Sequence, residues 1–450
     1  MASLRPLQRL AALLGAALLA VSGCSERQAV DDSGAGPYGN WRAVLPVPGG
    51  DLPFGLEIAR VDGRDVAWLV NGPERVEVTD VRVEGGRVTM GMPGFPHRLE
   101  ARMKDGRLEG EVIFLRPGGR TQPARLVAER SAGWRFFPPS PGSNADFSGR
   151  WALTFRDPDT GAESSGIAEL RQDGRVVTGT VLRESGDDRF IAGEARGDTV
   201  FLSRFDGGTA YRYVARLNAQ GELEGELRSG TGTYRQLSGR RDAAARLADA
   251  TTLTQLDEKA GPVRFTFPDV QGRPVSLADE RFRGKVVIVT IGGTWCPNCH
   301  DEAAFLRDFL PSRREGGLEV VQLMFEYDTD LASATSSVRD FVDKFAIDYP
   351  VLIAGTYEAG AVQRAIPQLT KFYAYPTMLV LDRSGRIRHT HTGFSGPATG
   401  AHYQEFVREF SALIDGMLAE EGSDPARGLS PQGTVPSRGV KEGSDPSRGV

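Results

Sequence analysis

The chain has 450 residues, of which 40% are hydrophobic and 25% are charged, so it has enough apolar material for two or three folded domains. Its formal net charge is -5, and it contains no block of basic residues. We therefore set nucleic acid aside as a partner, because that binding requires lysines and arginines that neutralise a run of phosphates.

The N-terminus has the pattern of a secretory signal. Arg5 and Arg9 precede an apolar run over residues 10–21, which is about as long as a signal-peptide core and too short to span a bilayer permanently. Residues 21–24, Val-Ser-Gly-Cys, resemble the bacterial lipobox, in which the cysteine, here Cys24, is lipidated and begins the mature protein. The alternative is an ordinary signal peptide followed by an incidental cysteine.

A lipidated Cys24 predicts a membrane-anchored protein, since several acyl chains hold firmly where a single chain binds only marginally. The body would then face the periplasm. Ser25 resembles the sorting residue that favours the outer membrane in a cell with two membranes. The expected location is therefore the cell envelope.

Residues 38–241 are expected to be all-β, because short stretches alternate apolar and polar residues between Gly-rich turns. The region is also duplicated in pattern, with three motifs recurring in order at an offset of about 110 residues. These are Gly-x-Trp at 39–41 and 149–151, the stretches 55–64 and 166–175 that end in Asp-Gly-Arg, and Leu-Glu-Gly-Glu at 108–111 and 223–226.

A Gly-x-Trp motif that opens a run of about eight short strands resembles the lipocalin or calycin pattern, in which the tryptophan closes one end of a small barrel. The sequence leaves barrel and sandwich equally open. A barrel interior could hold an apolar ligand or be filled by its own side chains. A spacer or docking module is favoured over a ligand carrier.

From residue 262 strands alternate with helices, which predicts an α/β domain. A buried strand at 286–289 leads to Cys296-Pro-Asn-Cys299, two thiols one helical turn apart. We further expect a hairpin at 265–277, a helix to about 310, a strand at 318–324, a helix at 333–345, a strand at 349–353, a strand-turn-strand at 375–387 and a helix at 402–418.

Four motifs carry a resemblance to a known family. They are Phe-x-x-x-Asp-x-x-Gly-x-Pro-Val-Ser-Leu from residue 265, Phe-Arg-Gly-Lys at 282–285, Gly-Thr-Trp-Cys-x-x-Cys at 293–299, and Tyr-Pro-Thr at 375–377 before a strand ending in Asp-Arg-x-Gly. Together they resemble the TlpA/ResA branch of the thioredoxin superfamily, bordering on the AhpC/TSA group.

The resemblance implies a redox site with named roles. Cys296, at the exposed start of a helix, would attack a partner disulfide, and Cys299 would resolve the mixed disulfide. Pro376 would be the family's cis-proline beside the thiols, and Trp295 would support the turn. Glu302 would move a proton to or from Cys299 if it is buried, or else be a solvated glutamate.

His300 is expected at the surface. The five histidines do not combine with cysteine at zinc spacing, so no metal and no cofactor is expected. The three cysteines, Cys24, Cys296 and Cys299, leave none for a structural disulfide.

The predicted function is that of an envelope thiol–disulfide oxidoreductase, and we favour a reductase that acts on cysteine pairs of other proteins. Its electrons would come from an unidentified donor in the envelope. A peroxiredoxin-like peroxidase is disfavoured, because Gly292 and Cys296 stand where its Pro-x-x-x-Thr-x-x-Cys frame needs proline and threonine. A third reading is a ligand- or protein-binding lipoprotein with an accessory redox domain.

The sequence thus predicts two all-β domains, each a lipocalin-like barrel or a sandwich, followed by an α/β thioredoxin-fold domain. The predicted boundaries are a lipoprotein signal peptide at 1–23, a tether at 24–37, β domain 1 at 38–136, a linker at 137–146, β domain 2 at 147–241, a helical linker at 242–261, a thioredoxin-like domain at 262–420 and a disordered tail at 421–450.

Overall fold

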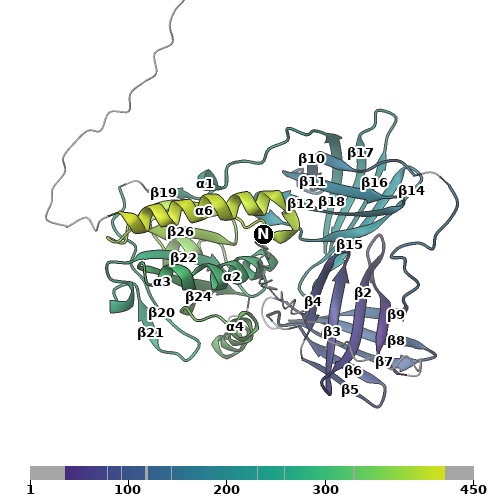
Figure 1. Ribbon diagram of the computed structural model, residues 1–450, viewed down its shortest axis with the longest axis horizontal. Helices are drawn as coiled ribbons and strands as arrows, with labels where there is room; N and C mark the ends of the chain where they lie inside the picture. The colour runs from purple at the N-terminus through teal and green to yellow at the C-terminus, as the bar shows by residue number, and fades with distance from the viewer. Residues whose placement is uncertain are drawn as a thin grey trace, which may run out of the picture.

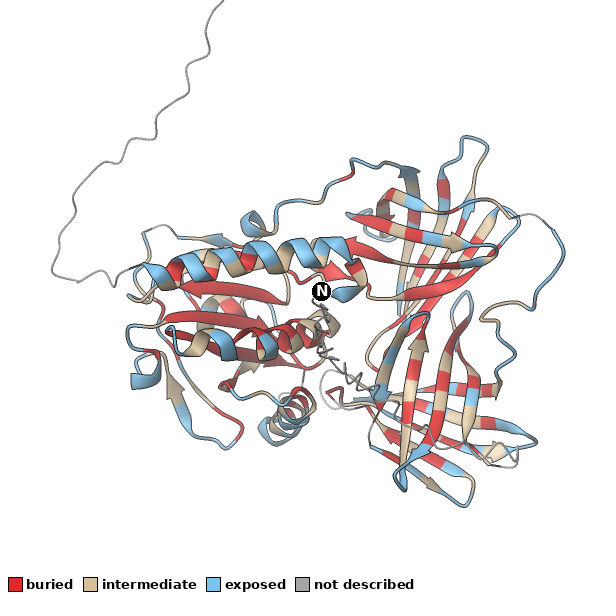
Figure 2. Ribbon diagram, in the orientation of Figure 1, coloured by how far each residue is buried: buried red, intermediate tan, exposed pale blue. Residues whose placement is uncertain are grey.

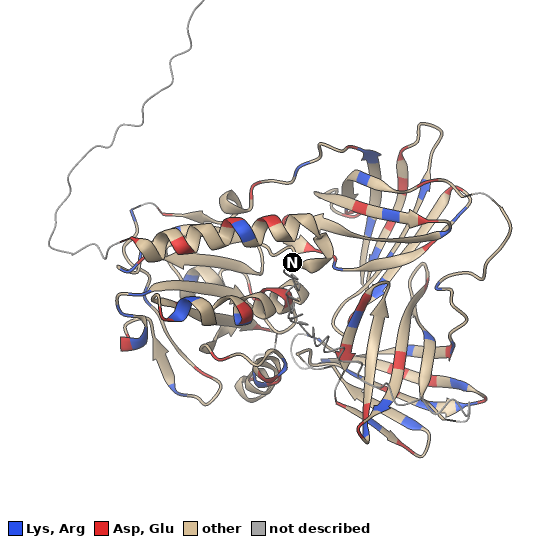
Figure 3. Ribbon diagram, viewed as in Figure 1, with Lys and Arg blue, Asp and Glu red and all other residues tan. Residues whose placement is uncertain are grey.

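The computed structural model describes residues 36–420 except 79, 93, 117–119, 143, 231, 258 and 328–329. The predicted signal peptide, Cys24 and the tail lie outside these residues. Two β sheets and an α/β domain make up the described part (Figure 1). Acidic and basic residues are interspersed over all three in the view of Figure 3. None of the described helices is long and apolar enough to cross a membrane.

The first β domain is a nine-stranded antiparallel meander in the order β4-β3-β2-β1-β9-β8-β7-β6-β5. It curls around an apolar core, and Val83 N in β5 donates a hydrogen bond of 3.0 Å to Asp65 Oδ2 in β3, near where the ends of the sheet meet. Its strands are β1 (Gly39–Val47), β2 (Gly50–Val61), β3 (Arg64–Asn71), β4 (Glu74–Val78), β5 (Val81–Glu84), β6 (Arg87–Gly91), β7 (Arg98–Lys104), β8 (Arg107–Arg116) and β9 (Arg120–Arg130).

The second β domain repeats this meander and closes, because its strands β11 and β12 also pair with each other. A closed sheet of this kind is a barrel rather than a sandwich. Its strands are β10 (Gly149–Arg156), β11 (Glu163–Asp173), β12 (Val176–Arg183), β13 (Gly186–Asp187), β14 (Ile191–Arg196), β15 (Thr199–Phe205), β16 (Ala210–Leu217), β17 (Leu223–Ser229) and β18 (Thr233–Arg241).

Both β domains bury an equivalent tryptophan in their first strand, under a stacked arginine. Trp151 Nε1 donates to the carbonyl of Phe147 at 2.9 Å, and the Arg241 guanidinium lies 4.3 Å above the indole. In the first domain Trp41 is likewise covered by Arg130, at 4.0 Å, and donates four residues back along the chain. The repeated arrangement supports the predicted duplication.

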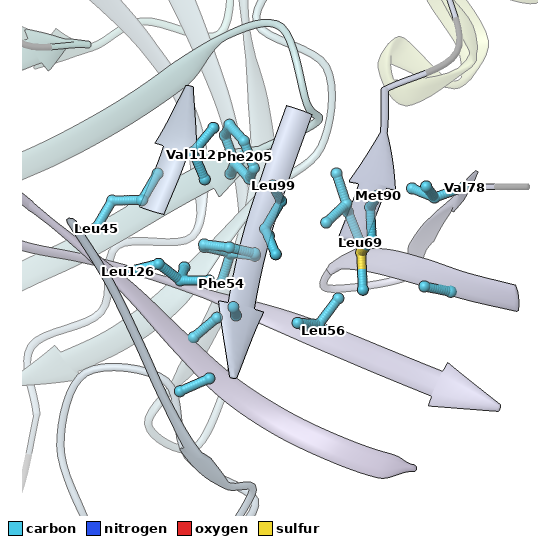
Figure 4. Packing of buried hydrophobic residues seen from close by; sticks show 14 of the residues in the cluster. Leu45, Phe54, Leu56, Leu69, Val78, Met90, Leu99, Val112, Leu126 and Phe205 are labelled. Atoms are coloured by element: carbon cyan, nitrogen blue, oxygen red, sulfur yellow. The ribbon is translucent and has the colours of Figure 1, made fainter. Parts of the chain in front are cut away.

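The second β domain adds side chains to the apolar core of the first, while keeping a core of its own. Phe205, at the end of β15 in the second domain, packs inside the cluster of the first, with its ring centroid 4.8 Å from that of Phe54 (Figure 4). The Asn71 side chain accepts from Phe205 N at 3.0 Å and donates to its carbonyl at 2.9 Å. The barrels are therefore fixed to each other rather than strung on a linker.

The third domain has a five-stranded sheet in the order β24-β23-β22-β26-β27. The first three strands are parallel, and β22 and β23 are buried along their whole length, as parallel strands covered on both faces must be (Figure 2). Its strands are β22 (Val286–Gly292), β23 (Leu318–Glu326), β24 (Val351–Thr356), β26 (Thr377–Leu381) and β27 (Ile387–Thr392); its helices are α2 (Pro297–Phe309), α3 (Pro311–Arg314), α4 (Leu331–Phe345), α5 (Ala361–Ala365) and α6 (Ala401–Ala419).

The hairpin expected before this sheet consists of β20 (Thr266–Pro268) and β21 (Pro274–Ser276), which pair antiparallel. Two one-turn 3₁₀ segments, Glu280–Phe282 and Pro397–Thr399, complete the domain. The predicted order of strands and helices, including the antiparallel β26–β27 hairpin, is found in the structure.

The segment 242–261 departs from the expected helical linker. It forms one helical turn, α1 (Ala250–Leu253), and a short strand β19 (Gln255–Leu256) that pairs with β25 (Leu369–Lys371). The preceding chain stays extended because Ala245 and Leu247 pack against apolar residues of the second barrel. Burial of these side chains overrides the helix propensity of the local sequence.

We expect Trp151→Ala to lower the free energy of unfolding of the second barrel by about 3–5 kcal/mol, because it empties a fully buried site. Urea unfolding of the full chain, with hydrogen exchange of β10–β18, measures this. Val176→Ala, at a half-exposed position of the same barrel, should change it by less than about 0.5 kcal/mol. Equal effects of both variants would contradict the stabilising role of the buried Trp151 side chain.

Candidate active site

The two thiols lie at the start of α2, directly after the buried strand β22. Cys296 is the N-cap residue of the helix and is joined to Cys299 by a disulfide. Its sulfur accepts a hydrogen bond from Cys299 N at 3.3 Å, and Pro297 occupies the first turn, where no N–H is needed. In the reduced state the same helix end would stabilise a thiolate on Cys296.

Pro376 lies at the adjoining sheet edge. The Tyr375–Pro376 peptide is cis, and β26 begins immediately after it. Thr377 pairs with Ile291 near the end of β22, so the proline and the dithiol share one end of the sheet. The Pro376 carbonyl accepts from Gly393 N at 2.7 Å.

Trp295 is anchored by a hydrogen bond of 2.9 Å from its Nε1 to the Phe325 carbonyl. Its indole stacks on Tyr327 at 4.6 Å and meets the rings of Tyr357 and Tyr375 edge-on. Strand β23 and the cis-proline segment are thereby joined to the turn that precedes Cys296.

Glu302 is fully buried on α2, one turn beyond Cys299. Burial raises its pKa to about 8, and the hydrogen bond donated by Thr290 Oγ1 offsets this only in part. The buried acid thus comes from the helix α2, and the strand β22 supplies the hydroxyl that pairs with it.

Sequence reasoning missed Glu326, a buried acid at the end of β23. Its carboxyl accepts from Thr294 N at 2.9 Å and from Thr294 Oγ1 at 2.6 Å, and burial raises its pKa to about 7. Glu326 thus holds the turn that carries the dithiol. The available signal was a carboxylate directly after the apolar run at residues 323–325, at the end of a strand that is parallel to β22.

Two expectations about exposure were wrong. Cys296, expected at an exposed helix start, is only 4% exposed, and His300, expected at the surface, is 1% exposed. The reason is that the β domains cover this end of α2, with Phe95 of the first domain stacked on the His300 ring at 4.1 Å.

Burial, and secondly the neighbouring Lys344 ammonium, hold the pKa of His300 well below its ordinary range. The neutral ring donates from Nε2 to the Thr294 carbonyl at 2.8 Å. Its role in this structure is to support the same turn as Glu326. Among the described residues, no group of three or more His, Cys, Asp and Glu side chains is placed to hold a metal ion.

Comparison with known proteins agrees with this geometry. Residues 255–404 match the Redoxin family. The chain is 26% identical over 147 residues to thiol-disulfide oxidoreductase ResA of Bacillus thuringiensis subsp. konkukian, covering 33% of this chain and 75% of that protein. It is 24% identical over 163 residues to ResA of Halalkalibacterium halodurans, covering 36% and 79% respectively.

Among solved structures, a thiol:disulfide interchange protein of the thioredoxin family from Chlorobium tepidum TLS aligns at 23% identity, over 36% of this chain and 99% of that one, with a TM-score of 0.27. The family match and the sequence relatives confirm that the third domain is a thioredoxin-fold domain of the TlpA/ResA type. With its paired cysteines, the chain is a thiol–disulfide oxidoreductase.

We expect Glu302→Gln to weaken the pH dependence of stability. The folded state keeps the Glu302 proton up to about pH 8, whereas the unfolded chain releases it near the ordinary value of 4.5. The free energy of unfolding should therefore fall as pH rises between these values and level off above them.

Urea unfolding of the oxidised protein at several pH values measures this fall, which the variant should make shallower. A residual fall should persist, because burial also raises the pKa of Glu326 and of Asp187 to about 7. Glu409→Gln, at an exposed position of α6, should leave the profile unchanged. If the Glu302→Gln profile is identical to that of the wild type, the raised pKa of Glu302 is contradicted.

Proposed function

We propose that this chain is a cell-envelope thiol–disulfide oxidoreductase that reduces disulfides in partner proteins through Cys296 and Cys299. The observation that carries the proposal is the dithiol at the N-terminus of α2, with the cis-proline Pro376 beside it and Glu302 buried one turn on. An electron donor of the envelope, a dithiol protein by its chemistry, returns the site to the reduced state.

In the first step the Cys296 thiolate attacks one sulfur of a partner disulfide. A bond forms between Cys296 Sγ and that sulfur, the partner's S–S bond breaks, and the other partner sulfur leaves as a thiolate. The helix N-terminus favours the attacking thiolate, because backbone N–H groups point towards the sulfur.

In the second step Cys299 loses its proton and attacks Cys296 Sγ, which releases the second partner thiolate and closes the Cys296–Cys299 disulfide. Two electrons have then passed to the partner. Cys299 is fully buried, so its proton needs an internal acceptor, and Glu302 is the buried acid on the same face of α2. With a pKa near neutrality, its carboxyl can both accept and release that proton.

The proposed reducing direction is based on the resemblance to the TlpA/ResA branch and not on the dipeptide between the cysteines. Related active sites span roughly -270 to -120 mV, so Pro297 and Asn298 do not decide it. The envelope location rests on the signal-like residues 10–21 and on Cys24 in its lipobox-like setting.

Cys299→Ser should trap partner proteins as mixed disulfides, because Cys296 still attacks and no second thiol resolves the adduct. Incubation with envelope extract, followed by non-reducing electrophoresis and mass spectrometry, reveals the adducts. Cys296→Ser is the matched control and should trap none. If Cys299→Ser forms no reductant-sensitive adduct, the proposal that partner proteins are the substrates is wrong.

Cys24→Ser should move the protein from the membrane fraction to the soluble fraction of the envelope, because the acyl anchor is lost. Fractionation and incorporation of labelled fatty acid in the producing cell measure this. Ser25→Asp should keep the label and change the membrane in which the protein is found. A wild-type chain that takes up no label would exclude the anchor.

A further inference from the structure

A segment of the second β barrel contacts Asn298, the residue between Pro297 and Cys299 in the redox turn. It comprises residues 184–189, the turn after β12 together with β13. In Figure 1, β12 reaches from the barrel to the end of the third domain where α6 begins. Gly186 forms an isolated parallel bridge with Phe394, which follows the glycine that donates to the Pro376 carbonyl. The segment therefore runs along the edge of the active site.

Asp187 makes the central contacts of this segment. Asn298, between the two cysteines, donates from Nδ2 to the Asp187 carbonyl at 3.0 Å and to Asp187 Oδ1 at 3.2 Å. The same carboxylate oxygen accepts from Gly396 N at 3.0 Å. At the N-terminal end of the segment, Glu184 accepts a hydrogen bond from the Tyr373 hydroxyl.

Arg189 extends the contact to all three domains. Its guanidinium lies 2.8 Å from Glu74 in the first barrel, 3.7 Å from Asp206 in the second and 3.4 Å from Asp301 on α2. In this arrangement, with Phe95 also stacked on His300, Cys296 is 4% exposed and Cys299 is fully buried. A partner disulfide cannot reach either sulfur in this arrangement.

We propose that residues 184–189 are a displaceable cover, which must lift from the dithiol before a protein partner can exchange with Cys296. This inference rests on the proposed function, because it describes how that site is opened. The contacts of the segment with the third domain are mainly hydrogen bonds and ion pairs, as in domain interfaces that move. A partner polypeptide could replace the hydrogen bonds made to Asn298 and Gly396.

Gly186→Ala is the variant designed to lift the cover. Gly186 has φ of +136°, and a Cβ there would overlap the Asn298 amide and the Phe394 carbonyl, which both belong to the third domain. Gly174→Ala is the matched control, since Gly174 also has positive φ in the same barrel and its Cβ would meet nothing within 4 Å. Tyr373→Phe, at a partly exposed site, removes only the hydroxyl that binds Glu184.

The measurement is the rate at which tris(2-carboxyethyl)phosphine reduces the oxidised full chain. The phosphine gives two electrons to the disulfide and takes oxygen from water, so two thiols and a phosphine oxide result. Free thiols are counted by rapid alkylation and mass spectrometry. Because a covered group reacts in proportion to its opened population, Gly186→Ala should be reduced about tenfold faster, Tyr373→Phe about threefold, and Gly174→Ala at the wild-type rate.

A folded Gly186→Ala protein that is reduced at the wild-type rate overturns the cover. So does a wild-type disulfide that reacts as fast as that of a short Cys-Pro-Asn-Cys peptide. If Gly186→Ala does not fold, Tyr373→Phe decides in the same way. The phosphine needs no protein partner, so a faster rate without transfer to protein disulfides would keep the cover and remove the proposed function instead.

Discussion

The side-chain amide of Asn298 joins the redox turn to the rest of the molecule. It lies between the two cysteines and donates to the Phe394 carbonyl of its own domain, at 2.9 Å, as well as to Asp187 of the second barrel. The position of the second barrel and the accessibility of Cys296 are therefore not independent. Movement of one requires these hydrogen bonds to be exchanged.

Contacts elsewhere in the structure also hold the β domains against the redox turn. Phe205 of the second barrel buries its ring in the core of the first, which fixes the two barrels to each other. Arg189 then connects the joined barrels to Asp301 near the start of α2. The β domains therefore affect the redox site through their position next to it, and each has an apolar core.

Local sequence patterns were sufficient to predict the helices and strands of the third domain. The apolar strand before Cys296, the Tyr-Pro-Thr motif and the repeated Gly-x-Trp each record a short-range requirement, and each lies where the pattern placed it. The burial of Cys296 and His300 could not be predicted from the sequence. Asp187 and Phe95, which pack at this end of α2, lie more than 100 residues away in the chain. No periodicity in one segment records a contact made with another domain.

The protonation of the site follows from the same burial. Asp187, Glu302 and Glu326 surround the dithiol turn, and burial raises the pKa of each to between about 7 and about 8. Near neutral pH these carboxyls hold protons for much of the time, so they oppose a thiolate on Cys296 less than three ionised carboxylates would. Lifting residues 184–189 would rehydrate Asp187 and favour its ionised form, while Glu302, buried within the third domain, would keep its raised pKa and so stay able to exchange a proton with Cys299. Opening the site would therefore add to the partial negative charge that Asp187, with a pKa of about 7, already carries beside Asn298 near neutral pH.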